Sequence, residues 1–143
     1  MLLQSLTDRI YKCLVRREHS IWELKSKFRG FASESIIDSV IEGFTQRGEQ
    51  SDLRFSEMLC RSRFNRGKGP IALLNELQEH RIDPEIIENV MAEYEDKWDA
   101  LANRIRSRKF GDQPPSSFKE WSRQARFMQQ RGFSVNYIEP YSN

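Results

Sequence analysis

Residues 30–41 read Gly30-Phe-Ala-Ser-Glu-Ser-Ile-Ile-Asp-Ser-Val-Ile41, a glycine turn followed by an amphipathic helical pattern. The same turn and apolar stripe recur from Arg81-Ile82 and again from Gly132-Phe133. The residues directly after the three turn positions are Phe31, Ile82 and Phe133, and each lies 51 residues from the next. A turn and a stripe repeated at a fixed spacing predict three copies of one helical unit.

Helical spacing of apolar residues extends over the rest of the chain, from Leu6, Ile10 and Leu14 to Tyr137, Ile138 and Tyr141. Capping boxes at Ser20 to Glu23 and at Ser117 to Glu120 predict two helix starts, and Asp83-Pro84 predicts a third. No segment alternates apolar and polar residues as a strand does. We expect an all-α fold of three tandem three-helix repeats, at 1–47, 48–93 and 94–143, that stack as a short, elongated and curved solenoid.

Composition excludes several classes of protein. Of the 143 residues, 38% are hydrophobic and 31% charged, and the longest apolar run, Ile71 to Leu74, is far below the roughly 18 residues of a membrane span. The N-terminus lacks the features of a secretory signal, so we expect a cytoplasmic protein that does not bind membranes. Cys13 and Cys60 stand far apart, which favours buried thiols over a disulfide framework.

The sequence offers little chemistry for catalysis. His19 and His80 are the only histidines, and no cluster has the spacing of metal ligands or of a catalytic triad. The segment Arg66-Gly-Lys-Gly-Pro70 lacks the GxxxxGK[ST] spacing of a nucleotide-binding loop. We therefore expect a protein that is not an enzyme and that holds no metal or cofactor.

Charge is unevenly distributed along the chain. The net charge is +2 overall, and over the three predicted repeats it is +2, −3 and +3. A helix predicted from Glu95 to Phe110, with Trp98, Leu101 and Ile105 in the core, places cations along one flank. The candidate partner-binding residues are Arg66, Lys68, Lys97, Arg104, Arg108, Lys109, Arg123 and Arg126.

Each of these cations also has a simpler interpretation. A charge run is often only a solvated helix face, and the basic turn at Arg66 and Lys68 is equally consistent with a plain connection between helices. The aromatic residues fall mostly in core register, so we do not expect them to stack on nucleobases.

Several short motifs, in order along nearly the whole chain, resemble those of the RecX regulatory proteins, bacterial modulators of the recombinase RecA. They are Arg17-Glu-His-Ser20, Arg54-Phe55, Arg66-Gly-Lys-Gly-Pro70 and Arg126-Phe127 with Arg131-Gly-Phe133. Each motif alone is weak, and their combination carries the resemblance. The chain departs from the family pattern where Arg81 replaces the usual glycine before Ile82.

The resemblance implies an all-α protein of three three-helix repeats that binds in the groove of the RecA nucleoprotein filament. Such a protein inhibits the ATPase, strand-exchange and co-protease activities of RecA by blocking or dismantling the filament. The implied partners are the RecA filament and single-stranded DNA within or near it, and we expect a monomer.

The alternative is a direct DNA-binding protein of helix-turn-helix type, because three-helix units share that geometry. The helices expected at 33–44 and 84–91 carry acidic residues and no Lys or Arg, which makes a poor face for a major groove.

Overall fold

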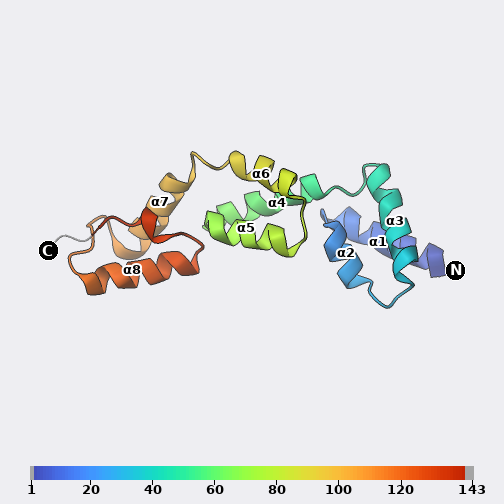
Figure 1. Cartoon of the computed structure of the whole chain (residues 1–143), viewed down its shortest axis with the longest axis horizontal. Helices are drawn as coiled ribbons and strands as arrows, with labels where there is room; N and C mark the ends of the chain where they lie inside the picture. The colour runs from blue at the N-terminus through green and yellow to red at the C-terminus, as the bar shows by residue number, and fades with distance from the viewer. Residues whose placement is uncertain (1, 141–143) are drawn as a thin grey trace. The chain divides into compact units, whose positions relative to one another are not determined.

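The computed structural model describes residues 2–140. These residues form eight α-helices and one 3-10 turn and no strand, so the predicted all-α class is confirmed (Figure 1). The helices are α1 (Leu2–Arg16), α2 (Ile21–Lys27), α3 (Glu34–Gln46), α4 (Asp52–Asn65), α5 (Pro70–Glu79), α6 (Pro84–Ala92), α7 (Trp98–Phe110) and α8 (Phe118–Gln130), and the 3-10 turn η1 is Val135–Tyr137.

The helices pack as two units. The first contains the residues up to Met58 together with Leu77–Ile87, and the second contains Leu59–Glu76 together with the residues from Glu88 onward. Helices α4, α5 and α6 each contribute to both units.

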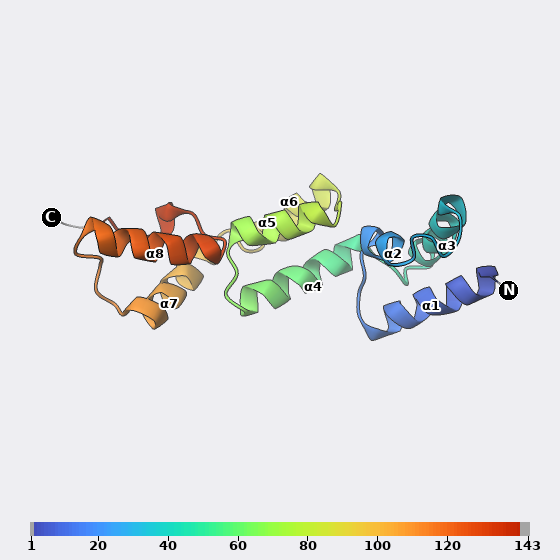
Figure 2. The same ribbon diagram turned by 90° about the horizontal axis from the view of Figure 1, so that it is seen from below.

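The core of the first unit forms where α3 packs against α1 and α2 (Figures 1 and 2). The predicted stripes of these helices supply it, with the buried residues Leu6, Ile10, Cys13, Leu24, Phe28, Ile37, Ile41 and Phe44. The prediction was wrong for Ile36, which is 38% exposed. Its neighbour Ile37 faces the core instead, because adjacent helical residues point about 100° apart.

The core of the second unit includes Leu101, Met128 and Phe133, which are almost fully buried. The rings of Phe64, Tyr94 and Trp98 add a cluster with centroids 5.0 to 5.8 Å apart. The predicted start of α7 at Glu95 was wrong, because residues 93–97 form turns and the helix begins at Trp98.

The last predicted helix is only the 3-10 turn η1, and Tyr141, which was assigned to it, lies outside the described residues. Ile138 already has extended backbone angles. Pro140 disfavours helical geometry at the residue before it, which explains why the element ends early.

The capping predictions were right at two helices and half right at a third. Ser20 and Glu23 form the reciprocal box at α2, and Asp83 accepts from the backbone N–H of Glu85 at 2.8 Å. At α8 the Ser117 side chain accepts from Glu120 N, but the Glu120 carboxylate accepts from the backbone N–H and the hydroxyl of Ser116.

The repeated turn has a left-handed backbone in all three copies. The φ angles are +84° at Gly30, +56° at Arg81 and +91° at Gly132, and Arg81 is the one residue other than glycine with a positive φ within 2–140. Ile82 N donates to Leu77 O and Phe133 N donates to Met128 O, so the second and third copies end their helices alike. Arg81 therefore occupies a position that favours glycine.

Arg81→Gly should leave the free energy of unfolding unchanged or raise it by up to about 1 kcal/mol, because it removes the left-handed strain of a side chain. Gly30→Ala makes the reverse change, from glycine to a residue with a side chain. A Cβ at this position meets no atom within 4 Å, so the φ of +84° is the only source of strain. That variant should lose about 1 kcal/mol in urea unfolding. A clear loss of stability in Arg81→Gly would contradict the conclusion that Arg81 occupies the same left-handed turn as Gly30 and Gly132.

Candidate functional site

In the second unit, two of the short motifs touch each other through their backbones. Gly69 N donates to Arg131 O at 2.6 Å, and Ile71 N donates to Gly132 O at 3.0 Å. A Cβ on Gly69 would lie 2.5 Å from Gly132 O, and a Cβ on Gly132 would lie 2.5 Å from the Cβ of Ala72. The close approach of the two backbones therefore requires glycine at both positions. We call this contact the glycine joint, formed by Gly69, Arg131 and Gly132.

The glycine joint places the turn after α4 against α7 and the end of α8. Arg131 Nη1 donates to Arg66 O at 3.4 Å, and a Cβ on Gly67 would lie 3.0 Å from Ile105 Cδ1. Between these segments is a pocket of about 290 Å³, which we call the basic pocket. It is lined by Asn65, Arg66, Gly67, Leu101, Arg104, Ile105, Arg108, Lys109, Phe127 and Arg131.

The lining of the basic pocket holds five cations and no carboxylate. Leu101 and Ile105 give it an apolar wall, and the Lys109 ammonium and the Arg131 guanidinium lie 5.6 and 5.4 Å from the centroid of the Phe127 ring. Within the described range 2–140, no carboxylate lies within salt-bridge distance of any of the five cations.

Unpaired cations at this spacing repel one another. Arg104 and Arg108 are one helical turn apart on α7, where like charges cost a few tenths of a kcal/mol. An anionic group in the basic pocket would offset that repulsion and accept several charge-assisted hydrogen bonds. The arrangement suits recognition of a phosphate or carboxylate.

The structure brings together four of the eight predicted binding residues, Arg66, Arg104, Arg108 and Lys109. Arg123 and Arg126 line a separate hollow at the start of α8. Lys68 and Lys97 line neither, and the Lys97 ammonium lies 5.5 Å from the centroid of the Tyr94 ring.

Two features of this unit were not predicted from the sequence. The first is that Arg131 lines the basic pocket. The second is that Arg106 is buried, at 5% exposure, and follows the buried Trp98 and Ala102 at a spacing of four residues. That spacing was a usable signal for Arg106. Tyr11 and Phe118, which are 54% and 63% exposed, are exceptions to the expectation that the aromatic residues fall mostly in core register.

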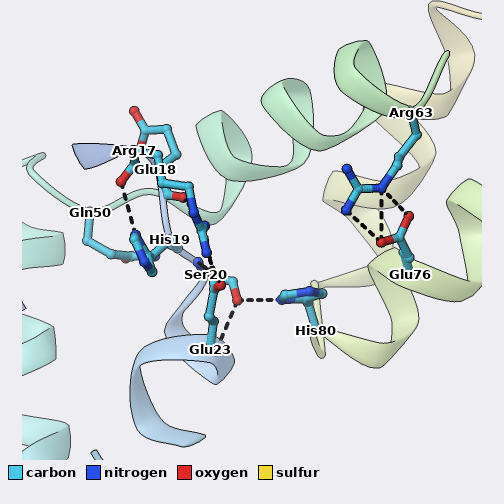
Figure 3. Close-up of polar contacts among 9 residues, drawn as sticks. All are labelled: Arg17, Glu18, His19, Ser20, Glu23, Gln50, Arg63, Glu76 and His80. Atoms are coloured by element: carbon cyan, nitrogen blue, oxygen red, sulfur yellow. Dashed lines mark hydrogen bonds and ion pairs between the residues drawn. The ribbon is translucent and has the colours of Figure 1, made fainter. Parts of the chain in front are cut away.

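The motif Arg17-Glu-His-Ser20 forms a structural network in the first unit (Figure 3). The Arg17 guanidinium pairs with the Glu23 carboxylate, and Ser20 Oγ hydrogen-bonds His80 Nδ1 at 2.8 Å. Gln50 Nε2 donates to His19 O at 3.1 Å. The motif thus fixes the entry into α2 rather than forming an open site.

Burial within this network lowers the pKa of His19, and a hydrogen bond to Arg17 O opposes that shift only in part. Burial alone would raise the pKa of Glu23, but the bond from Arg17 lowers it below its ordinary value. His19 is therefore held neutral and Glu23 ionised near pH 7.

Other chemistry is sparse in the part of the chain that the structure describes. Within residues 2–140, no three His, Cys, Asp or Glu residues gather as a metal site, and no helix is long and apolar enough to cross a membrane. Cys13 and Cys60 are buried free thiols, as predicted. Burial raises the pKa of Cys60 to about 11, so this thiol is a poor nucleophile at neutral pH.

Comparisons with known proteins agree with the motif resemblance. Residues 51–91 match the family model described as the second three-helix domain of RecX, and residues 95–139 match that of the third. Regulatory protein RecX of Halorhodospira halophila is 33% identical over 136 residues, covering 94% of this chain and 84% of the relative. Regulatory protein RecX of Legionella pneumophila is 37% identical over 134 residues, covering 92% and 88%.

Solved structures agree with the helical architecture. A crystal structure of regulatory protein RecX matches with a TM-score of 0.80 at 15% identity, over 95% of this chain and 70% of that one. The crystal structure of RecX from Lactobacillus salivarius matches with a TM-score of 0.77 at 19% identity, over 96% and 92%. At these identities the matches establish the fold.

Gly69→Ala should destabilise the protein by about 1–3 kcal/mol in urea unfolding, because the new methyl group meets the backbone of Gly132. Gly43→Ala is the control. Gly43 lies within α3, and a Cβ there approaches only Nη1 of the exposed Arg47 side chain, at 3.3 Å. The control should gain up to about 1 kcal/mol from helix propensity. Equal effects in the two variants would contradict the glycine joint.

Stability should fall as the pH is lowered through about 6.5, the ordinary pKa of histidine. Because the pKa of His19 is lowered in the folded state, the unfolded chain binds the proton first and acid favours unfolding. Urea unfolding at about pH 7.5 and at about pH 6 measures the loss. His19→Asn, which keeps a donor for Arg17 O, should reduce this dependence, and an unaltered dependence would exclude His19 as its source.

Proposed function

The chain belongs to the RecX family of regulatory proteins, and from that membership we propose that it is a non-catalytic regulator of the RecA nucleoprotein filament. In this proposal it binds the filament and inhibits the recombinase, ATPase and co-protease activities of RecA. It acts in the cytoplasm as a monomer and uses no cofactor.

The observation that carries the proposal is the basic pocket. It gathers five cations around an apolar wall with no carboxylate in its lining, so it favours an anionic group on a large partner. Acidic side chains of RecA and phosphates of the single-stranded DNA in the filament both offer such groups. The proposed contact surface comprises Arg66, Lys68, Lys97, Arg104, Arg108, Lys109, Arg123 and Arg126.

The alternative, a direct DNA-binding protein of helix-turn-helix type, receives less support from the helices that would read the groove. Helix α3 carries Glu34, Asp38 and Glu42 and no cation, and α6 carries Glu85 and Glu88 and no cation. The corresponding element of the third predicted repeat is the three-residue turn η1. None of these elements offers the positive face that a major groove requires.

Reversing the charge of the basic pocket should abolish most of the inhibition. With Arg104→Glu and Arg108→Glu together, we expect the concentration for half-inhibition of the DNA-dependent ATPase of RecA to rise about tenfold or more. Both side chains are exposed, so the fold should be retained, as circular dichroism can check. Inhibition by the unaltered protein should weaken as salt screens the exposed charges.

The matched control is Lys12→Glu with Arg16→Glu on α1. These two exposed cations have the same one-turn spacing, also lie near a helix C-terminus and belong to the first unit. The control should inhibit normally. Full inhibition by the folded pocket variant would remove the basic pocket from the contact surface. Loss of affinity for naked duplex DNA, with a steep salt dependence in the absence of RecA, would instead favour the alternative.

A further inference from the structure

The basic pocket has the size of a small-molecule site. Its volume of about 290 Å³ is close to the lower end of the roughly 300–1,000 Å³ that such sites occupy. Its walls are fixed by close packing, since Arg131 O accepts from Gly69 N and a Cβ on Gly67 would lie 3.0 Å from Ile105 Cδ1. A pocket of this kind takes a compact group, which need not belong to a large partner.

The charge of the basic pocket has one sign. Among the described residues, its lining holds no carboxylate and carries four guanidinium groups and one ammonium group, on Arg66, Arg104, Arg108, Arg131 and Lys109. The side chains of Leu101 and Ile105 form an apolar wall beside them. A wall of low dielectric concentrates the field of such cations inside a cleft and raises the local concentration of anions there.

Arg131 is held in place and still has donors to offer. Its Nη1 donates to Arg66 O at 3.4 Å, and its guanidinium lies 5.4 Å from the centroid of the Phe127 ring. That hydrogen bond uses one of the five N–H donors of a guanidinium, so the others can bind a ligand. Arg131 therefore presents an oriented fork of donors to the pocket.

The one aromatic ring that the described residues place in the lining is already in contact with other groups. Besides Arg131, the Lys109 ammonium lies 5.6 Å from the centroid of the Phe127 ring. The Phe110 ring packs edge-on against Phe127, with centroids 5.4 Å apart. The pocket is therefore built to recognise charge rather than the flat ring of a ligand.

A chain of phosphates matches this lining better than a single carboxylate does. Guanidinium forks bind phosphate oxygens through paired charge-assisted hydrogen bonds. A phosphate chain carries several charges and many acceptor oxygens in a small volume, so it can contact several forks at once. It would also offset the repulsion between Arg104 and Arg108, which are one helical turn apart. A carboxylate offers two oxygens and one charge.

We propose that the basic pocket binds the phosphate chain of a soluble polyphosphate, either inorganic or carried by a nucleotide, without contact to a base. This inference rests on the proposed function in that it assigns a second, soluble ligand to the same pocket, and a ligand held there excludes the anionic group of a partner. Its test contains neither RecA nor nucleic acid, so its failure and the failure of filament inhibition are separate results.

Isothermal titration calorimetry of the full chain tests the proposal with inorganic triphosphate, ATP, citrate and inorganic phosphate. Triphosphate should bind at one saturable site, and ATP should bind within about threefold of it, because the base adds no contact. Citrate and inorganic phosphate should bind about tenfold more weakly or worse, because they reach fewer forks. All four affinities should fall as salt is raised.

Two double variants show where the triphosphate binds. Arg104→Ala with Arg108→Ala should weaken its binding about tenfold or more, because two charge-assisted contacts are lost. Lys12→Ala with Arg16→Ala is the matched control, since it removes two exposed cations of the same spacing from α1 in the other unit. The control should bind triphosphate as the unaltered protein does. Circular dichroism checks that both variants are folded.

Three results would overturn the proposal: no saturable binding of triphosphate, equal losses in the two double variants, or citrate bound as tightly as triphosphate. ATP bound about tenfold more tightly than triphosphate would show that a base is recognised, and it would overturn the assignment of the pocket to the phosphate chain alone.

Discussion

The C-terminal unit depends on the approach of two backbones at the glycine joint. At Gly69 and Gly132 no Cβ could be added without meeting backbone or a neighbouring methyl group. Because the chains approach so closely, Gly69 N reaches Arg131 O and the turn after α4 is fixed against the end of α8. That contact places Arg66 and Arg131, which are distant in sequence, on one basic pocket with the cations of α7.

In the N-terminal unit the equivalent contact is made by side chains. There a hydrogen bond between Ser20 Oγ and His80 Nδ1 holds the segment before α2 to the turn after α5. The centroids of the His80 and Phe55 rings lie 4.6 Å apart. In the second unit the equivalent contact is made by backbone groups, because Gly69 and Gly132 leave no room for a Cβ. The neighbouring turn at Arg66 and Gly67 lines the basic pocket together with the cations of α7.

Sequence patterns predicted the local features well. The spacing of 51 residues identified the repeated turn at Arg81, and helical geometry placed Arg104 and Arg108 on one flank. The basic pocket itself was not predictable, because Arg66 and Arg131 join it only through tertiary contact. Likewise the cap at Ser117 marks a helix start but does not say that the next residue, Phe118, remains exposed.

Hydrogen exchange at the Gly69 and Ile71 amides tests the glycine joint most directly. In the structure both amides donate to carbonyls of the turn after α8, although they lie at a turn and at the first positions of α5, where backbone donors have no partner within their own helix. They should therefore exchange as slowly as the amides inside α8, such as that of Met128. Exchange at the rate of an open loop, while Met128 stays protected, would contradict the joint and the basic pocket that it builds.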